Sequence, residues 1–424
     1  MRKLLLILLL ISANGFCLSD PRNLTGTKSL AEQIQTYQDV VKKSPRDVAA
    51  RNQLAYAYIR KVRATADQSY SILAEKILNE ALALDSSNYD SLVYLGLVQM
   101  SQHRFSDARS SAQKAVTIRP GDSSAYGVLG DASFELGLYQ DCATAYQKMM
   151  DLRPSTASYS RAFYYRRLVG DTEGATNMML KALDLVDFRD PENIAWCLVQ
   201  LGNLSLGSGK IDQAGQIFER ANDTLPNYYN ALAGLAKVRV AQGNTDEAIQ
   251  LYEKAISIVP MPEFVASLGD LYSTSGRPKE AQKQYELVEY IGLISKVNRE
   301  VYNRQLAMFY ADHDRNLSEA LRLAQEELKV RKDIYGYDAV AWCLYKNSKY
   351  SEALIAMKEA LKMDTQDAIL FYHAGMIYEK LGQISKTTKY LKAAFHINPQ
   401  FHPIFARTAK ETLARINTQK VAGS

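Results

Sequence analysis

A small side chain recurs at intervals of 33 or 34 residues along most of this chain, and this period constrains the fold more than any other feature. Seven of the nine intervals have that length, and the other two are 39 residues long. We call these small residues the anchor residues: Ala74, Ala108, Cys142, Ala175, Ala214, Ala248, Ala281, Ala320, Ala353 and Thr387. A period of about 20 to 50 residues is typical of a solenoid in which one supersecondary unit is repeated.

The residues around each anchor predict two helices per period. An apolar residue stands four positions after every anchor, and Ala stands seven positions after it in seven of the ten units. These offsets lie on one face of a helix. Proline, which cannot continue a helix, follows twelve positions after five anchors, at Pro120, Pro154, Pro226, Pro260 and Pro399. A second helix is indicated twelve positions before the anchors, where pairs such as Leu95-Gly96 and Leu201-Gly202 occur.

This pattern resembles the tetratricopeptide repeat (TPR), a helix–turn–helix of 34 residues with small residues where its two helices cross. Residues 195–226 match it closely, with Leu201-Gly202, Ala214 and Phe218 in register. The resemblance implies an all-α fold, a right-handed superhelical α-solenoid of stacked helix–turn–helix repeats whose neighbours bury a continuous core. Residues 261–289 and 331–354 also resemble uncharacterised secreted bacterial TPR proteins.

The chain divides into four parts on this basis. Residues 1–15 are expected to be a signal peptide, 16–46 an N-terminal segment with a half-repeat helix, 47–400 about nine TPR repeats, and 401–424 a C-terminal capping helix and tail. Between Leu54-Ala55, which opens the first repeat, and the anchor Ala74, the connection is seven residues longer than in a normal repeat. This predicts an extended turn or lengthened helices over residues 60–71. Five residues are added around 187–193, where a break is expected before Pro191, and five around 290–299, where a longer helix would absorb them.

The leader predicts export. Arg2 and Lys3 precede eight apolar residues, and Ala13-Asn14-Gly15 provides small residues for cleavage. Eight apolar residues are too few for a membrane anchor, which needs about 17 to 25. The mature chain is therefore expected in a periplasm or outside the cell, without stable insertion in a membrane.

Composition and motifs point away from catalysis. Lys and Arg number 51 against 46 Asp and Glu, a balance that does not favour nucleic acid as a partner. The sequence contains no G-x-S-x-G and no H-E-x-x-H motif, and its five His are scattered among the repeats. We expect no enzyme activity, no catalytic residue, no cofactor and no metal site.

The TPR resemblance instead implies a binding groove, because the first helix of each pair lines the concave face of such arrays. Register places eight candidate partner-binding residues there: Tyr164, Arg167, Asn203, Asn230, Lys237, Trp342, Tyr345 and Tyr372. Amide, ammonium and guanidinium groups suit peptide backbone or carboxylates, and the aromatic rings offer flat apolar contacts. The predicted function is a scaffold or adaptor for a peptide or protein. The alternatives are an accessory subunit of an envelope enzyme or transport complex, and a self-assembling structural protein that forms homo-oligomers through its end repeats.

Overall fold

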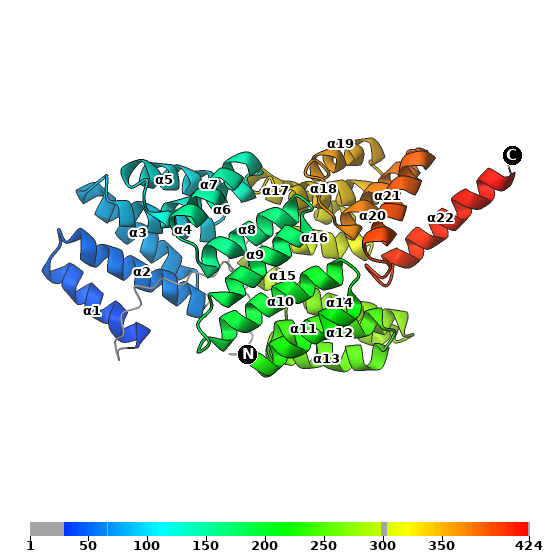
Figure 1. Ribbon diagram of the computed structural model, residues 1–424, viewed down its shortest axis with the longest axis horizontal. Helices are drawn as coiled ribbons and strands as arrows, with labels where there is room; N and C mark the ends of the chain where they lie inside the picture. Colours follow the sequence, from blue (N-terminus) through cyan, green and yellow to red (C-terminus); the bar gives the residue numbers. More distant parts are fainter. Residues whose placement is uncertain (1–28, 66, 298–302, 423–424) are drawn as a thin grey trace. The chain divides into compact units, whose positions relative to one another are not determined.

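The computed structural model describes residues 29–65, 67–297 and 303–422. The predicted signal peptide, residues 1–15, lies outside the described residues. Within the described ranges the chain forms helices joined by short turns, and no strand is present there. The predicted all-α solenoid of stacked helix pairs is confirmed (Figure 1).

The helices of the described residues are, in chain order, α1 (Leu30–Lys43), α2 (Val48–Thr65), α3 (Ser69–Leu84), α4 (Tyr89–Ser101), α5 (Phe105–Ile118), α6 (Ser123–Glu135), α7 (Tyr139–Leu152), α8 (Thr156–Leu168), α9 (Thr172–Asp184), α10 (Pro191–Gly207), α11 (Ile211–Thr224), α12 (Tyr229–Ala241), α13 (Thr245–Ile258), α14 (Pro262–Thr274), α15 (Pro278–Val297), α16 (Asn303–Asp312), α17 (Leu317–Val330), α18 (Ile334–Lys346), α19 (Tyr350–Ala360), α20 (Ala368–Lys380), α21 (Ile384–Ile397) and α22 (Phe405–Ala422).

Helices α2 to α21 follow one another as ten consecutive pairs in the described residues, one more than the nine or so repeats expected. Each of the ten anchor residues lies on the second helix of its pair, and all ten are buried. The seven extra residues of the first pair lengthen its helices, since α2 alone has 18 residues. A small side chain at each anchor position lets the two helices of a pair approach closely.

Glycines on the first helices make room for large side chains of the second. The Phe218 ring of α11 is fully buried between Gly202 of α10 and Gly234 of α12. A Cβ atom would lie 2.6 Å from this ring at Gly202 and 2.4 Å from it at Gly234. One aromatic ring therefore joins a repeat to the next, which is why the Leu-Gly pairs recur in the sequence.

The two 39-residue intervals are absorbed in different ways. After α9, the chain makes a turn and α10 begins at Pro191, with the Asp190 carboxylate accepting a hydrogen bond from the Asn193 backbone N–H at 3.1 Å. The helix break expected at this position is present. The second addition lengthens α15, which has 20 residues.

The ends of the array carry single helices. Helix α1 begins with a capping box in which the Ser29 side chain and the Glu32 side chain each bind the other residue's backbone N–H. Helix α22 buries Phe405, Ala409 and Ile416, which lie on one face. None of the helices in the described part of the chain is both long and apolar enough to cross a bilayer.

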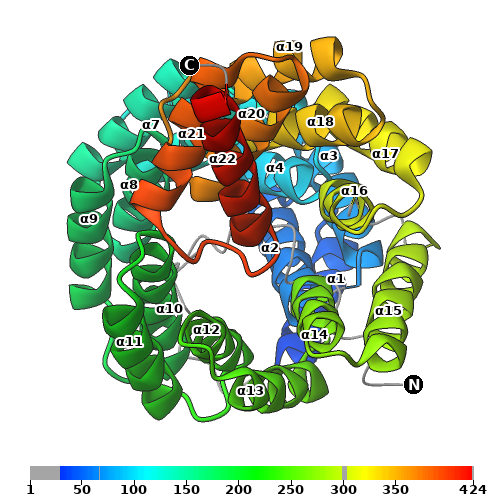
Figure 2. The same cartoon turned by 90° about the vertical axis from the view of Figure 1, so that its right-hand side faces the viewer.

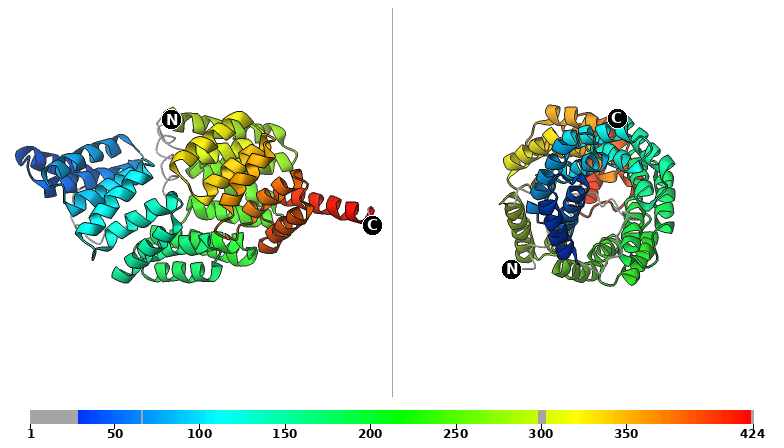
Figure 3. Two further views of the ribbon diagram at one scale, coloured as in Figure 1. Left: turned by 90° about the horizontal axis from the view of Figure 1, so that it is seen from above. Right: turned by 90° about the vertical axis from the view of Figure 1, so that its left-hand side faces the viewer.

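The chain divides into two compact units. Unit 1 comprises Met1–Ala162, Ser295–Val301 and Val330–Lys332, and unit 2 comprises Phe163–Ile294, Tyr302–Lys329 and Asp333–Ser424. In unit 2 the successive helix pairs follow a coiled path, which Figures 2 and 3 show from several sides.

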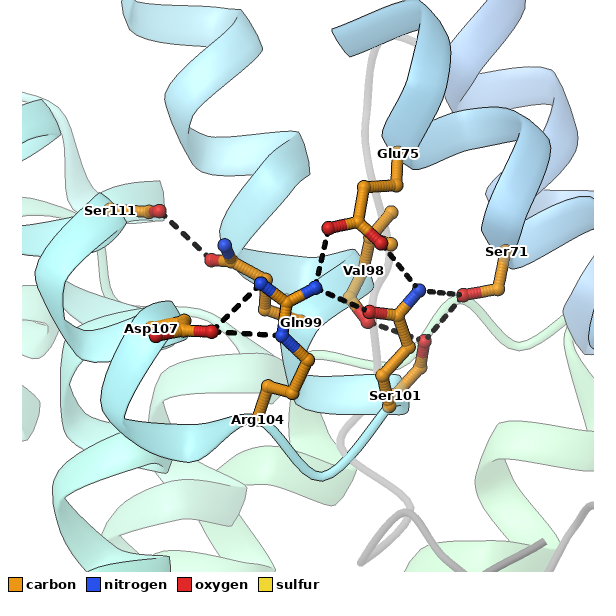
Figure 4. A network of polar contacts seen from close by, with 9 residues as sticks. Ser71, Glu75, Val98, Gln99, Ser101, Arg104, Asp107 and Ser111 are labelled. Carbon is orange, nitrogen blue, oxygen red and sulfur yellow. Dashed lines mark hydrogen bonds and ion pairs between the residues drawn. The ribbon is translucent and has the colours of Figure 1, made fainter. Parts of the chain in front are cut away.

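A polar network joins the first two repeats in unit 1 (Figure 4). The Arg104 guanidinium, in the turn between α4 and α5, donates to the carboxylates of Glu75 on α3 and Asp107 on α5. The Gln102 amide donates to Ser71 Oγ at 3.2 Å and to Glu75 Oε2 at 3.0 Å. Because the Arg104 side chain is 43% exposed, this network orients neighbouring repeats and contributes little stability.

Candidate functional site

Unit 2 coils far enough for its first two repeats to touch its last one. The Thr365 hydroxyl donates to the backbone carbonyl of Leu168, 197 residues away, and the Asn398 amide donates to the carbonyl of Leu206 at 2.9 Å across 192 residues. We call these two contacts the seam.

Two glycines allow the backbones to meet at the seam. Gly170 and Gly209 both have φ of +73°, a conformation that favours glycine. A Cβ atom would lie 2.8 Å from the Asp364 carbonyl oxygen at Gly170, and 3.0 Å from the Ile397 carbonyl oxygen at Gly209. Another residue would thus be strained in its backbone and crowded against the opposite side of the coil.

Two adjoining cavities lie inside the coil of unit 2. Their volumes are about 570 and 380 Å³, and both are lined by Ser267, Asp270, Tyr335 and His402. We call the two cavities together the lumen. The lining of the first cavity comes from α8, α10 and α12 on one side and from the segments 365–369 and 398–403 on the other.

Three of the eight predicted partner-binding residues meet in the first cavity. Arg167 projects from α8, Asn203 from α10 and Lys237 from α12, and all three line the same space. Arg167 and Lys237 are exposed to solvent within it, and Asn203 is half-buried. Sequence register thus identified one wall of the lumen.

The remaining five predicted residues lie elsewhere in unit 2. Trp342 and Tyr372 are only 2% and 3% exposed, and the Tyr372 ring stacks on Phe405 of α22 with centroids 4.8 Å apart. Tyr345 stacks on Trp342 at 4.7 Å. The expectation that Trp342 and Tyr372 offer free faces is corrected, because α22 packs against this end of the array and covers them.

The other two predicted residues are engaged in local hydrogen bonds. The Tyr164 hydroxyl donates to the Gln200 side chain at 3.1 Å, which joins α8 to α10. The Asn230 amide donates to the hydroxyl of Tyr228 at 3.2 Å, at the start of α12. Neither residue lines the two cavities.

Charged partners surround the first cavity. Desolvation lowers the pKa of the Arg167 guanidinium, but the electrostatic interactions with Tyr335 and Asp367 raise it by more. The net effect is a raised pKa, so the guanidinium stays charged. The Asp367 carboxylate caps α20 by accepting from the backbone N–H groups of Ile369 and Leu370 at 2.9 and 3.2 Å.

A buried charge pair lies at the second cavity. His313 Nδ1 is 2.7 Å from the Phe309 carbonyl oxygen and Nε2 is 2.8 Å from Asp270 Oδ1, so both ring nitrogens face acceptors. This geometry favours the imidazolium form, in which both nitrogens donate. Although desolvation lowers the pKa of His313, the contact with Asp270 raises it above its usual value. The Tyr285 hydroxyl donates to the same carboxylate oxygen at 2.9 Å.

His402 joins the two cavities and remains neutral. Its Nδ1 accepts from the backbone N–H groups of Ile404 and Phe405 at 3.3 and 3.4 Å, so it caps the start of α22. Burial lowers the pKa of His402 to about 4. The proton of the neutral ring therefore lies on Nε2.

Sequence reasoning missed Tyr335, Asp367 and His402, which all line the lumen. They lie at the starts of helices or in turns, outside the register positions from which the groove was predicted. Asp367 carries a detectable signal, an acidic residue directly before an apolar helix. Within the described residues, no group of three or more His, Cys, Asp or Glu could hold a metal ion.

Comparison with known families agrees with this architecture. Three family models described as tetratricopeptide repeat match residues 73–157, 205–266 and 368–401. The chain is therefore a tetratricopeptide-repeat protein.

The curated relatives that the chain matches are longer proteins, and the chain covers only part of their length. It is 27% identical over 187 residues to cellulose synthase 1 operon protein C of Komagataeibacter xylinus, which covers 42% of this chain and 14% of that protein. It is 20% identical over 305 residues to the BBSome complex member BBS4 of Bos taurus, covering 63% and 57% of the two chains. A solved TPR protein from Parabacteroides merdae has 17% identity and a TM-score of 0.44, with 62% of this chain and 96% of that chain covered.

Proposed function

We propose that this chain is an exported TPR adaptor that holds an extended segment of a partner protein in the lumen of unit 2. The observation that carries the proposal is the meeting of Arg167, Asn203 and Lys237, one from each of three successive first helices, in a single cavity. Protein interaction is the role that the TPR fold supports, and the proposal assigns no reaction to the chain.

The chemistry of the lumen suits a peptide. Its wall supplies an amide donor and acceptor at Asn203 and a hydroxyl acceptor at Ser267, in addition to charged groups. An extended peptide has one backbone donor and one acceptor at nearly every residue, which must find partners when it leaves water. A polar lumen meets this need better than an apolar groove would.

The seam determines how such a segment enters. Because the first two repeats of unit 2 touch its last repeat, at Leu168–Thr365 and Leu206–Asn398, the coil is closed on its side. A segment enters along the axis of the coil, or the seam opens to admit it.

A selection from a random peptide library on the purified chain tests the proposal. We expect selected peptides whose binding is at least tenfold weaker with Lys237→Glu, because the substitution reverses a charge in the lumen. Lys254→Glu is the matched control, since Lys254 is exposed on α13, the second helix of the same repeat. Equal binding to both variants, or no selected peptide, would contradict the proposal.

A second candidate is an accessory subunit of an envelope enzyme. It is favoured by similarity to a protein named for a cellulose synthase operon. The distinguishing observation is the bound partner: purification of an enzyme in a fixed ratio with this chain supports the accessory role.

A further inference from the structure

The positive charge of this chain is concentrated at its C-terminal end. Residues 368–424 contain eight Lys and Arg against two Asp and Glu, whereas residues 1–367 contain 43 against 44. The described part of this segment forms α20, α21 and α22, which pack against one another in unit 2 (Figure 1). This end therefore accounts for the net positive charge of the whole chain.

Helix α21 is the centre of this charge. It carries Lys386, Lys389 and Lys392, and among the second helices of the ten described pairs it is the one without Asp or Glu. All three lysines are exposed. Their intervals of three residues place them on one side of the helix, opposite the buried Thr387 and Leu391. The outer side of the last repeat is thus uniformly cationic.

The lysines of α21 lack the acidic neighbours that other second helices provide. On α17, for example, Arg322 pairs with Glu319 at 2.6 Å. At the C-terminal end, the Glu379 carboxylate already pairs with Lys380 at 3.7 Å and with Arg415 at 2.6 Å. Within the described residues, no carboxylate lies at ion-pair distance from the three ammonium groups of α21. Their charge is available to a partner.

Two tyrosines lie beneath these lysines. Lys386 Nζ is 4.9 Å from the centroid of the Tyr378 ring, and Lys389 Nζ is 5.5 Å from that of the Tyr390 ring. The two rings stack on each other, with centroids 5.5 Å apart and 7° between their planes. Because the ring faces are covered by each other and by the lysines, they offer no platform on which a nucleobase could stack. This arrangement argues against single-stranded nucleic acid as the partner.

The same surface also lacks the features of a protein interface. Such an interface usually has apolar or aromatic anchors at its centre. Among the side chains described from residue 368 to 418, no large hydrophobic residue is exposed, and the nearest one in the sequence is Ile355 of α19. The lysines of α21 line neither of the two cavities of the lumen. A layer of anionic lipid headgroups needs neither an apolar anchor nor a pocket.

We propose that the C-terminal end of unit 2 docks on the surface of a bilayer that contains anionic phospholipids, with Lys386, Lys389 and Lys392 facing the phosphate groups. Clusters of about four to eight Lys and Arg are typical of proteins that bind such headgroups, and each residue near the surface increases the affinity about fivefold. Arg407 and Lys410, which are exposed on α22, add to the cluster. The contact is electrostatic, and no helix enters the hydrocarbon. It is independent of the binding proposed for the lumen.

Vesicle co-sedimentation tests the docking. The protein is the purified chain without residues 1–15, whose apolar run would itself bind lipid. It is titrated with vesicles of phosphatidylcholine alone and with vesicles that also contain phosphatidylglycerol. We expect saturable binding to the vesicles with phosphatidylglycerol, binding at least tenfold weaker to phosphatidylcholine alone, and release as salt is added.

Charge-removing variants test the role of α21. One variant combines Lys386→Gln, Lys389→Gln and Lys392→Gln, and should bind the anionic vesicles about a hundredfold more weakly. The matched control makes the same substitution at three exposed lysines of other second helices, Lys148, Lys254 and Lys358. It removes the same total charge and should bind almost as the unmodified chain does. A third variant with Lys→Arg at the three α21 positions should keep the affinity, and circular dichroism verifies that each variant is folded.

Four results would overturn the inference. They are equal binding to both kinds of vesicle, unchanged affinity in the folded α21 variant, equal losses in the α21 variant and its control, and tighter binding of a poly-glutamate peptide or a single-stranded oligonucleotide than of vesicles at the same lysines. The last result would point to an acidic protein or a nucleic acid instead. Peptide binding in the lumen is measured separately with Lys237→Glu, so failure of this inference leaves the proposed function unaffected.

Discussion

At the scale of single residues, close packing between the helices limits which substitutions the chain tolerates. Phe218 is fully buried and fills the space left by two glycines on neighbouring first helices. A buried ring with neighbours on both sides cannot move away from an added methyl group. The glycines facing such rings are therefore required for packing, as Gly170 and Gly209 are required at the seam, whereas a glycine with open space around it, such as Gly207, tolerates a larger side chain.

We predict that Gly202→Ala lowers the free energy of unfolding of unit 2 by about 1–3 kcal/mol, because the new Cβ would lie 2.6 Å from the Phe218 ring. Gly207→Ala, at the end of the same helix with no atom within 4 Å of its Cβ, should be neutral or slightly stabilising. Urea unfolding followed by tryptophan fluorescence measures both, since Trp196 and Trp342 are the chain's two Trp and both lie in unit 2. A loss of stability in Gly207→Ala as large as in Gly202→Ala would contradict this packing account.

His402 should make unit 2 less stable in acid. The ring has a pKa of about 4 in the folded chain against its usual 6.5, so between these values the unfolded chain binds more protons and stability falls as the pH falls. We expect His402→Asn, which can still cap α22, to lose less stability than the wild type between pH 7 and pH 4, by roughly 2 kcal/mol. The measurement is urea unfolding at several pH values, and parallel pH curves for the two proteins would disprove the role of His402.

At the scale of elements, the anchor residues predicted the helix pairs and their order. Each anchor lies on the second helix of a pair, and the extra residues near 187 and 290 became a turn and a longer helix, as expected. Local periodicity fixes these features because each helix face must match its neighbour's face. The seam was beyond prediction, since it joins residues 192 and 197 apart and depends on small rotations accumulated over several repeats.

The repeat geometry also explains why only some of the predicted partner-binding residues line the lumen. Arg167, Asn203 and Lys237 were found because concave positions follow the repeat. Trp342 and Tyr372 occupy equivalent positions, but the last helix of the chain covers them. Register predicts which way a side chain faces, and it does not predict what a non-repeating terminal helix will cover.

We predict that the seam contributes modestly to stability. Thr365→Val and Asn398→Ala each remove one hydrogen bond between distant repeats, so each should lower the free energy of unfolding of unit 2 by about 0.5–1.5 kcal/mol. Hydrogen exchange should accelerate in the last turn of α10, because the Asn398 amide contacts the Leu206 carbonyl there. Thr388→Val is the control, because the Thr388 hydroxyl bonds within its own helix, to the Ile384 carbonyl. Unchanged exchange in the Asn398→Ala variant would show that the contact does not hold the coil closed.

At the scale of the whole molecule, the array consists of two compact units, and the proposed binding site belongs to unit 2 alone. Solenoid repeats contact mainly their neighbours, so one unit can bind a segment while the other serves a different contact. Self-association remains an alternative function for the end repeats. The adaptor account and the self-assembly account differ in which surface meets another protein.

Site-specific photocrosslinking in the source cells tests the adaptor account most directly. A benzophenone amino acid replaces Asn203, which lines the lumen, or Gln250, which is exposed on the second helix α13. We predict one covalent adduct with a partner protein from position 203, its loss when Lys237→Glu is added, and no such adduct from position 250. Adducts only from position 250, or only between copies of this chain, would contradict binding in the lumen.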